Sequence, residues 1–267
     1  MMPLKRVAVG VGGNDAGWHK LTWPQRARTV EEELRAHELD RICALFPPGA
    51  RILELGAGTG YQAARLSERG FDVTALDLPD AERTAEYFPV VPFDGIRLPI
   101  ATGSVDVVFS SNVLEHVEDL PGLLAETSRV LRAGGMAVHT MPSPTWRAAA
   151  TILHPVAGLV QQLARRRVGS APTAGTPTDQ RHLARRRLLP GPHGNFPSAW
   201  AELREYSSHA WSKCFTHAGF AVEKIQGLGL FYSGHCLSHL TIRQRKVLAR
   251  CLGSSCVLYR VAPRSNN

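Results

Sequence analysis

Apolar and amphipathic stretches alternate along the middle of the chain. Apolar runs, each about the length of one buried strand, occupy residues 51–56, 71–77, 105–111 and 136–141, with a shorter one at 90–93. Stretches with the helical spacing of apolar residues lie between them, at 61–69, 80–87 and 120–131. The alternation predicts βαβ units and hence an α/β fold, a doubly wound, mostly parallel sheet with helices on both faces.

The polarity pattern divides the chain into four units: a helical lead-in, the strand–helix core, a basic insertion that caps the substrate, and a C-terminal unit that completes the sheet. Their predicted bounds are 1–50, 51–142, 143–197 and 198–267. The elements predicted outside the core are helices at 29–46, 148–167 and 198–218, and strands at 220–225 and 256–262.

The positive charge of the chain is concentrated in the insertion. The formal net charge is +8, and residues 165–187 hold seven Arg against a single acid, Asp179. A segment of this kind could lie on an anionic membrane surface, bind a phosphate-bearing acceptor, or form a solvated loop. The charge alone does not decide among the three.

Cysteine usage and hydropathy indicate the compartment. Five Cys form no CxxC pair, and their odd number argues against a disulfide framework. No stretch has the length and hydropathy of a signal peptide or of a spanning helix. We therefore expect a soluble, cytoplasmic protein, with the inner face of the membrane as an alternative location through the basic insertion.

A glycine-rich turn follows the first predicted strand. It reads Glu54-Leu-Gly-Ala-Gly-Thr-Gly60, and glycines at a βα turn let the backbone approach a ligand closely. Asp77 ends the second strand, where a carboxylate can bind ribose hydroxyls. A dinucleotide fingerprint would place its third glycine at position 61, which is Tyr61. Because Glu54 suits an ammonium group better than a pyrophosphate, the pattern favours a nucleoside that carries an amino acid.

Six ordered blocks between residues 48 and 142 resemble the class I S-adenosylmethionine-dependent methyltransferases of the small-molecule branch. The blocks are Ile52-Leu-Glu-Leu-Gly-Ala-Gly-Thr-Gly60, Leu76-Asp77, Asp94-Gly-Ile-Arg-Leu-Pro99, Ser104-Val-Asp-Val-Val-Phe109, Asn112-Val-Leu-Glu-His116 and Arg129-Val-Leu-Arg-Ala-Gly-Gly135. The resemblance implies a Rossmann-like sheet of seven strands, six parallel and one antiparallel, whose last two strands are 220–225 and 256–262. A looser similarity links the C-terminal third to methyltransferases of bacterial surface-polysaccharide and glycoconjugate pathways.

The resemblance also implies a cofactor, S-adenosyl-L-methionine, and the residues that hold it. Gly56, Gly58 and Gly60 would approach it with their backbone, and Glu54 would lie near its amino group. Asp77 would bind the ribose and Asp94 the adenine amine, although Pro92 in the short third strand makes the place of Asp94 less secure than that of Asp77. Leu78, Gly95 and Asn112 complete the expected cofactor site.

His116 is the candidate catalytic base, because it follows the fourth strand at the edge where doubly wound sheets bind ligands. It could instead serve only to pack against the helix that starts near Asp119. Further histidines that could fold over the mouth are His19, His193, His209 and His235. No metal site is expected, since the His235-x-x-x-His239 pair has no evident third ligand.

The acceptor is expected to be a small molecule or a glycoconjugate, methylated on a hydroxyl. Nucleic acid is not expected, because Ser110-Ser-Asn-Val113 stands where amino-methylating enzymes of nucleic acid carry an Asn/Asp-Pro-Pro-aromatic clamp, and no Cys follows a Pro. Besides a nicotinamide-dependent oxidoreductase, two alternatives remain open. One is a non-catalytic nucleoside-binding module of the same fold, and the other is an N- or C-methyltransferase of a quinone or another lipid-like acceptor.

Overall fold

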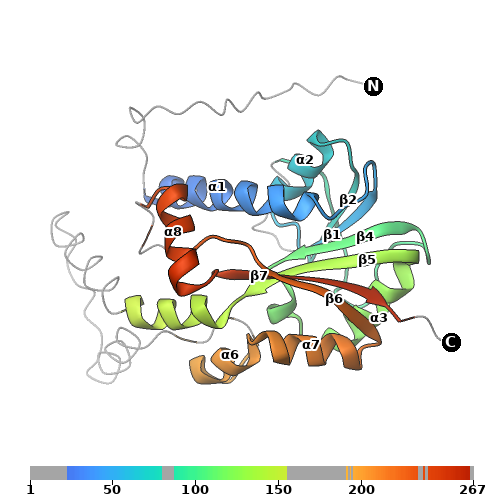
Figure 1. Cartoon of the computed structure of the whole chain (residues 1–267). Coiled ribbons are helices and arrows are strands. Elements are labelled where there is room, and N and C mark those ends of the chain that lie inside the picture. Colours follow the sequence, from blue (N-terminus) through green and yellow to red (C-terminus); the bar gives the residue numbers. More distant parts are fainter. Residues whose placement is uncertain are drawn as a thin grey trace, which may run out of the picture.

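A computed structural model describes residues 23–79, 87–154, 195–233 and 240–264, together with the single positions 191, 193 and 237. One seven-stranded sheet runs through these residues in the order β3-β2-β1-β4-β5-β7-β6 (Figure 1). The first four strands along the chain are β1 (Arg51–Leu55), β2 (Asp72–Asp77), β3 (Val90–Pro92) and β4 (Val105–Ser111), which form the centre and one flank of the sheet. All four run parallel, as the predicted βαβ alternation requires.

The strands β1 and β4 lie in the middle of the sheet because their sequences are apolar on both faces. β1 pairs with β2 on one side and with β4 on the other, so that Ile52 stands opposite both Val73 and Val107. Continuous apolar runs of this kind are typical of parallel strands that helices cover on both sides. Since parallel strands end at one edge, Leu55, Asp77 and Ser111 bring their loops together there.

The other half of the sheet contains the single antiparallel strand. β5 (Leu131–Pro142) is parallel to β4, and β7 (Cys256–Pro263) is antiparallel to both β5 and β6 (Phe220–Gly227). The α/β class and the mostly parallel sheet of seven strands with one antiparallel strand are therefore confirmed. β5 begins five residues earlier than predicted and passes through Gly134 and Gly135, where its pairing with β4 shifts register.

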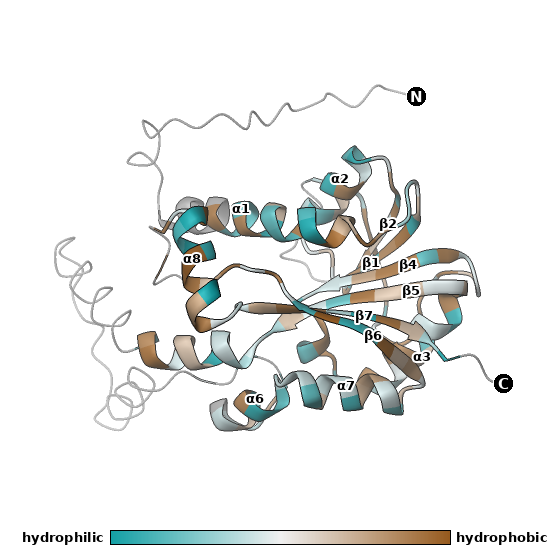
Figure 2. Cartoon of the chain, in the orientation of Figure 1, coloured by the Kyte–Doolittle hydropathy of each residue, from teal (hydrophilic) through white to brown (hydrophobic). Residues whose placement is uncertain are grey.

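Helices cover both faces of the sheet (Figure 1). One face carries α1 (Trp23–Cys43), α2 (Tyr61–Glu68) and α8 (Ile242–Leu252), and the other carries α3 (Leu120–Val130), α6 (Ala199–Glu205) and α7 (Ser208–His217). Leu39 and Ile42 of α1 pack with Phe109 on the first face, while Phe215 of α7 packs with Leu53 on the second. Figure 2 shows the result, apolar strands between helices whose outer sides are polar.

The structure corrects three expectations outside the core. The helix expected at 198–218 is two helices, because Ser207 leaves the helical conformation and its side chain accepts a hydrogen bond from Ala210 N to start α7. The helix expected at 29–46 begins earlier and ends at Cys43. The helix α8 was not predicted from the sequence, although Thr241 and Gln244 form a capping box at its start.

Several predicted features lie outside the described residues. They are most of the helix at 80–87, the linker, the basic segment 165–187, His19, His235 and His239. Of the insertion, residues 144–154 are helical and follow directly on β5. None of the described helices combines the length and apolarity that crossing a membrane requires.

Candidate functional site

A cavity of about 580 Å³ opens at the carboxyl edge of β1, β2 and β4. It lies where the strand order reverses between β1 and β4, the place where doubly wound sheets bind ligands. The predicted site residues that line it are Gly56, Gly58, Asp77, Leu78, Asn112 and His116. Its other walls come from α1 and α2 and are Glu31, Glu32, Arg35, Tyr61 and Gln62.

The glycine turn forms the floor of this cavity, and its three glycines have different roles. A Cβ at Gly56 would collide with the side chain of Val113, and a Cβ at Gly60 would lie 2.7 Å from the carbonyl oxygen of Phe88. A Cβ at Gly58 would meet no protein atom within 4 Å, and its φ of +56° favours glycine. Gly56 and Gly60 thus allow close packing of the protein, whereas Gly58 keeps the floor of the cavity open.

Asp77 ties the end of β2 to the glycine turn. One carboxylate oxygen accepts a hydrogen bond from Gly58 N at 2.7 Å, and the other accepts one from Leu78 N at 2.7 Å. Each carboxylate oxygen can accept more than one hydrogen bond, so the group can still face hydroxyls of a ligand in the cavity. The sequence placed this carboxylate beside the turn, and the structure brings the two together.

Glu54 is a buried acid beneath the same turn. Its Oε2 atom is enclosed and has no hydrogen-bond partner. Burial, with a smaller contribution from the charge of Asp77, raises the pKa of Glu54 to about 8. A buried carboxyl group without a partner is costly, and a ligand ammonium next to it would supply one.

Asp94 and Gly95, in contrast, do not line the cavity. The carboxylate of Asp94 is exposed and accepts hydrogen bonds from Ile96 N and Arg97 N, which lowers its pKa. A Cβ at Gly95 would lie 2.9 Å from a methyl group of Leu78, which does line the cavity. The loop after β3 therefore touches the site only indirectly, through the contact of Gly95 with Leu78. The Asp94 carboxylate is engaged by backbone N–H groups of its own loop.

A second cavity of about 250 Å³ shares a wall with the first. The shared residues are Arg35, Asn112 and His116, and the second cavity continues to Pro142, Trp146, His193, Tyr232 and Cys256. His116 ends the short helix η2 (Leu114–His116) that follows β4, and its side chain is 46% exposed. Ring contact with His193, at 4.9 Å between centroids, places two imidazoles at the junction.

Arg35, which the sequence pattern did not single out, is fixed in this shared wall. It forms an ion pair with the buried Glu38 at 3.1 Å, and Tyr232 donates a hydrogen bond to Glu38 at 2.7 Å. With its amide oxygen turned toward α1, Asn112 accepts hydrogen bonds from both terminal nitrogens of Arg35. Asn112 itself has a φ of 53°, an uncommon conformation that often marks functional sites.

His193 is held by a buried ion pair in the segment before α6. Arg147 and Glu202 are 2% and 0% exposed, and Arg147 Nε lies 2.9 Å from Glu202 Oε2. The other oxygen of Glu202 accepts a hydrogen bond from His193 N, and Tyr206 donates one to His193 O at 3.0 Å. Desolvation lowers the pKa of His193 to about 4, and the charges of His116 and Arg147 act in the same direction.

A family model described as a methyltransferase domain matches residues 26–225 of the chain. The chain belongs to this family. The match includes most of α1, the whole glycine turn and both histidines at the cavity junction.

Curated relatives of this methyltransferase match only part of its length. The bifunctional biotin-biosynthesis protein BioHC of Cellvibrio japonicus is 34% identical over 139 residues, which are 50% of this chain and 26% of BioHC. A malonyl-[acyl-carrier protein] O-methyltransferase of Serratia marcescens is 38% identical over 96 residues, 33% of this chain and 37% of that protein. The chain thus spans well under two thirds of these relatives.

Solved methyltransferase structures share the fold over nearly the whole chain. An S-adenosylmethionine-dependent methyltransferase from Mesorhizobium loti covers 84% of this chain and 97% of its own, with a TM-score of 0.51 and 19% identity. The 1,6-didemethyltoxoflavin-N1-methyltransferase of Burkholderia thailandensis, solved with S-adenosylhomocysteine, covers 94% and 85%, with a TM-score of 0.52 and 15% identity.

The cofactor of this methyltransferase is S-adenosylmethionine, and the first cavity fits it. The open space above Gly58 suits a ligand that lies on the backbone. The buried Oε2 of Glu54 has no hydrogen-bond partner, but Glu54 is not among the residues that line the cavity. Residues on α1 that line the same cavity were missed because a helix of mixed polarity gives no sign of which side chain will lie above a distant turn. Trp146, Tyr232 and Cys256 were missed because no local pattern shows which side chains from distant segments will line one cavity.

Proposed function

We propose that the chain transfers the methyl group of S-adenosylmethionine to a hydroxyl oxygen of a small-molecule or glycoconjugate acceptor. The observation that carries this proposal is the wall that the two cavities share, with His116 on it. A cofactor in the first cavity and an acceptor in the second would meet there, and methyl transfer requires that the two reacting atoms be aligned at contact distance.

The acceptor cavity provides both apolar and polar contacts. Trp146 and Tyr232 offer aromatic surface, and Trp146 packs on the His193 ring at 4.8 Å between centroids. Arg35 places a fixed cation at the shared wall. A compact polyhydroxylated ring or an oxygen-rich head group fits such a lining better than a bare hydrocarbon does.

The cofactor supplies an electrophilic methyl group, and the protein must orient the hydroxyl and give its proton a path out. His116 is the side chain we propose as the proton acceptor, since it reaches both cavities. Asp77 and Gly58 hold the cofactor in register, and Glu54 binds its amino group from below. Asp94 and Gly95 stay proposed cofactor contacts that require the loop after β3 to move toward Leu78.

The Serratia marcescens relative is named an O-methyltransferase, which supports oxygen as the acceptor atom. The Burkholderia thailandensis enzyme is named an N1-methyltransferase, so nitrogen is the competing acceptor atom. The test is incubation of the chain with S-adenosylmethionine labelled in its methyl group and a panel of hydroxyl, amine and carboxyl acceptors, followed by mass spectrometry of the products. We expect label on a hydroxyl oxygen. Label on nitrogen or carbon alone would refute the acceptor assignment, and no product with any acceptor would favour a binding module.

The role of His116 is tested by His116→Ala with the exposed His209→Ala on α7 as a matched control. Loss of a proton acceptor costs about 10²–10⁴ in kcat. We expect a loss in this range for His116→Ala, no loss for His209→Ala, and similar affinity for S-adenosylhomocysteine in both. An equal kcat in the two variants would exclude His116 from proton transfer.

A further inference from the structure

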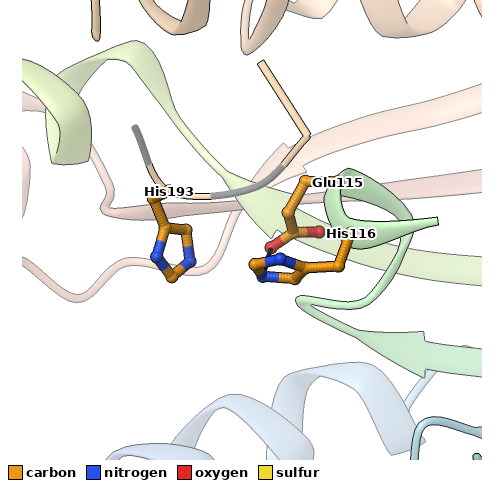
Figure 3. Close-up of side chains that lie close together, drawn as sticks. All are labelled: Glu115, His116 and His193. Atoms are coloured by element: carbon orange, nitrogen blue, oxygen red, sulfur yellow. Dashed lines mark ion pairs between the residues drawn. The ribbon is translucent and has the colours of Figure 1, made fainter. Parts of the chain in front are cut away.

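Three side chains from two distant parts of the chain meet at the junction of the cavities. The carboxylate of Glu115 and one imidazole nitrogen each of His116 and His193 all lie within 4.8 Å of one another. Figure 3 shows the two imidazoles facing each other, with the Glu115 carboxylate beside the ring of His116. Two imidazoles and one carboxylate are a ligand set that divalent transition metals accept.

Glu115 is the most unusual member of this cluster. Its side chain is 0% exposed, and neither carboxylate oxygen accepts a hydrogen bond. His116 Nε2 lies 4.0 Å from Oε1. Buried carboxylates are normally paired with a cation or bound to a metal. A cation bound beside Glu115 would supply this missing partner.

The backbone around the cluster is fixed by hydrogen bonds between the two segments. Asn195 N donates to the carbonyl oxygen of Glu115 at 3.0 Å, and the Asn195 amide donates to that of His116 at 2.7 Å. Together with the bond from Tyr206 to His193 O, these contacts hold all three residues near one point before any ligand arrives.

The two nearby arginines have carboxylate partners of their own. Arg147 pairs with Glu202 at 2.9 Å, and Arg35 pairs with Glu38 at 3.1 Å. Their charges are therefore largely compensated, and a cation among Glu115, His116 and His193 would not face two unpaired guanidinium groups.

We propose that Glu115, His116 and His193 bind one divalent transition-metal ion, with Zn²⁺ as the first candidate. Tetrahedral bonds of about 2.0–2.2 Å place donor atoms roughly 3.3–3.6 Å apart, so the three side chains need to close by about an ångström. Three protein ligands leave a fourth position open, which is typical of catalytic rather than structural sites.

The chemical role of this ion rests on the proposed function. Its open position would face the second cavity, where it would lower the pKa of a bound acceptor hydroxyl. The oxygen then bonds to the methyl carbon, the carbon–sulfur bond breaks with its electron pair on sulfur, and the hydroxyl proton leaves to water. With the metal bound, His116 is a metal ligand and no longer the proton acceptor. The metal then acidifies the hydroxyl, and water accepts the proton.

The binding site is tested on the full chain without cofactor or acceptor, so that its result does not depend on the proposed function. Chelator-treated protein is titrated with Zn²⁺ by calorimetry and with Co²⁺ by visible absorption. We expect one ion per chain, and affinity reduced roughly tenfold or more in His193→Ala and in Glu115→Gln. The control His209→Ala should bind as the wild type does.

Absence of stoichiometric binding in the folded wild type, or equal binding in His193→Ala, would overturn the site. Circular dichroism of each variant separates loss of a ligand from loss of the fold. If the ion binds but the chelated and reloaded enzymes transfer methyl groups at the same rate, the catalytic role is wrong. If neither form transfers methyl groups while binding persists, the proposed function fails and the metal site stands.

Discussion

At Gly58, a single added methyl group tests whether the ligand lies on the glycine turn. Its neighbours Gly56 and Gly60 have protein atoms where a Cβ would lie, but Gly58 has none within 4 Å. A methyl group there would project into the space that the ligand occupies. Gly49 has a similar φ of +66° and equally open surroundings, but it lies outside the cavity lining.

We predict that Gly58→Ala and Gly49→Ala lose similar stability, about 1–2 kcal/mol each, because both place a Cβ in the left-handed region. Affinity for S-adenosylhomocysteine, measured by calorimetry, should fall at least tenfold in Gly58→Ala and stay unchanged in Gly49→Ala. Equal affinities in the two variants would show that the ligand does not lie on this turn.

At the scale of elements, the sequence predicted well wherever a segment's own pattern determines its structure. β4 has the bounds expected for it, because Val105–Ser111 is apolar on both faces and must be a buried strand. The break between α6 and α7 was missed because Ser207 lies in an otherwise helical pattern, and only its capping bond to Ala210 N shows the new start.

The residues of the site also fall into two groups, those that a local motif predicts and those that only long-range packing brings together. The glycine turn and Asp77 are local motifs at strand ends, so the sequence could place them together. The partnership of His116 with His193 depends on how a segment 77 residues further along folds back, and Arg35 reaches the cavity from a helix that precedes the sheet. No local pattern contains such contacts, which arise from packing between elements.

A buried ion pair, Arg147–Glu202, connects the helical residues 144–154 with α6. We predict that Arg147→Met destabilises the chain by about 3–5 kcal/mol in urea unfolding, since it removes the cation that pairs with the buried carboxylate of Glu202. The double variant Arg147→Met/Glu202→Leu should recover most of this loss.

The matched control is the exposed pair Arg204–Glu205, whose side chains are 83% and 37% exposed. Arg204→Met should change the free energy of unfolding by less than about 1 kcal/mol. A similarly small effect of Arg147→Met would mean that the buried pair does not hold these elements together.

For the whole molecule, Glu54 links stability to pH. Burial raises its pKa to about 8 in the folded chain, against 4.5 for an ordinary glutamate. Between these values the folded chain holds a proton that the unfolded chain has lost, so the free energy of unfolding falls as the pH rises. The stabilising contribution is complete below about pH 4.5 and is lost as the pH passes through 8.

We predict that Glu54→Gln, which is neutral at every pH, removes this loss. The wild type should lose on the order of 2–4 kcal/mol more than the variant between about pH 5 and pH 8, measured by urea unfolding without ligand. Parallel pH profiles for the two proteins would show that Glu54 does not titrate in this range.

The position of β7 between β5 and β6 has a consequence for synthesis on the ribosome. In the described part of the chain, β6 pairs with the sheet only through β7, and β7 follows the other six strands in the sequence. Until it emerges, β5 has an open edge, β6 has no strand partner, and the nascent chain exposes apolar surface that chaperones recognise. The cofactor half of the sheet can form during translation, but the wall of the second cavity that contains Cys256 must wait for release of the final strand.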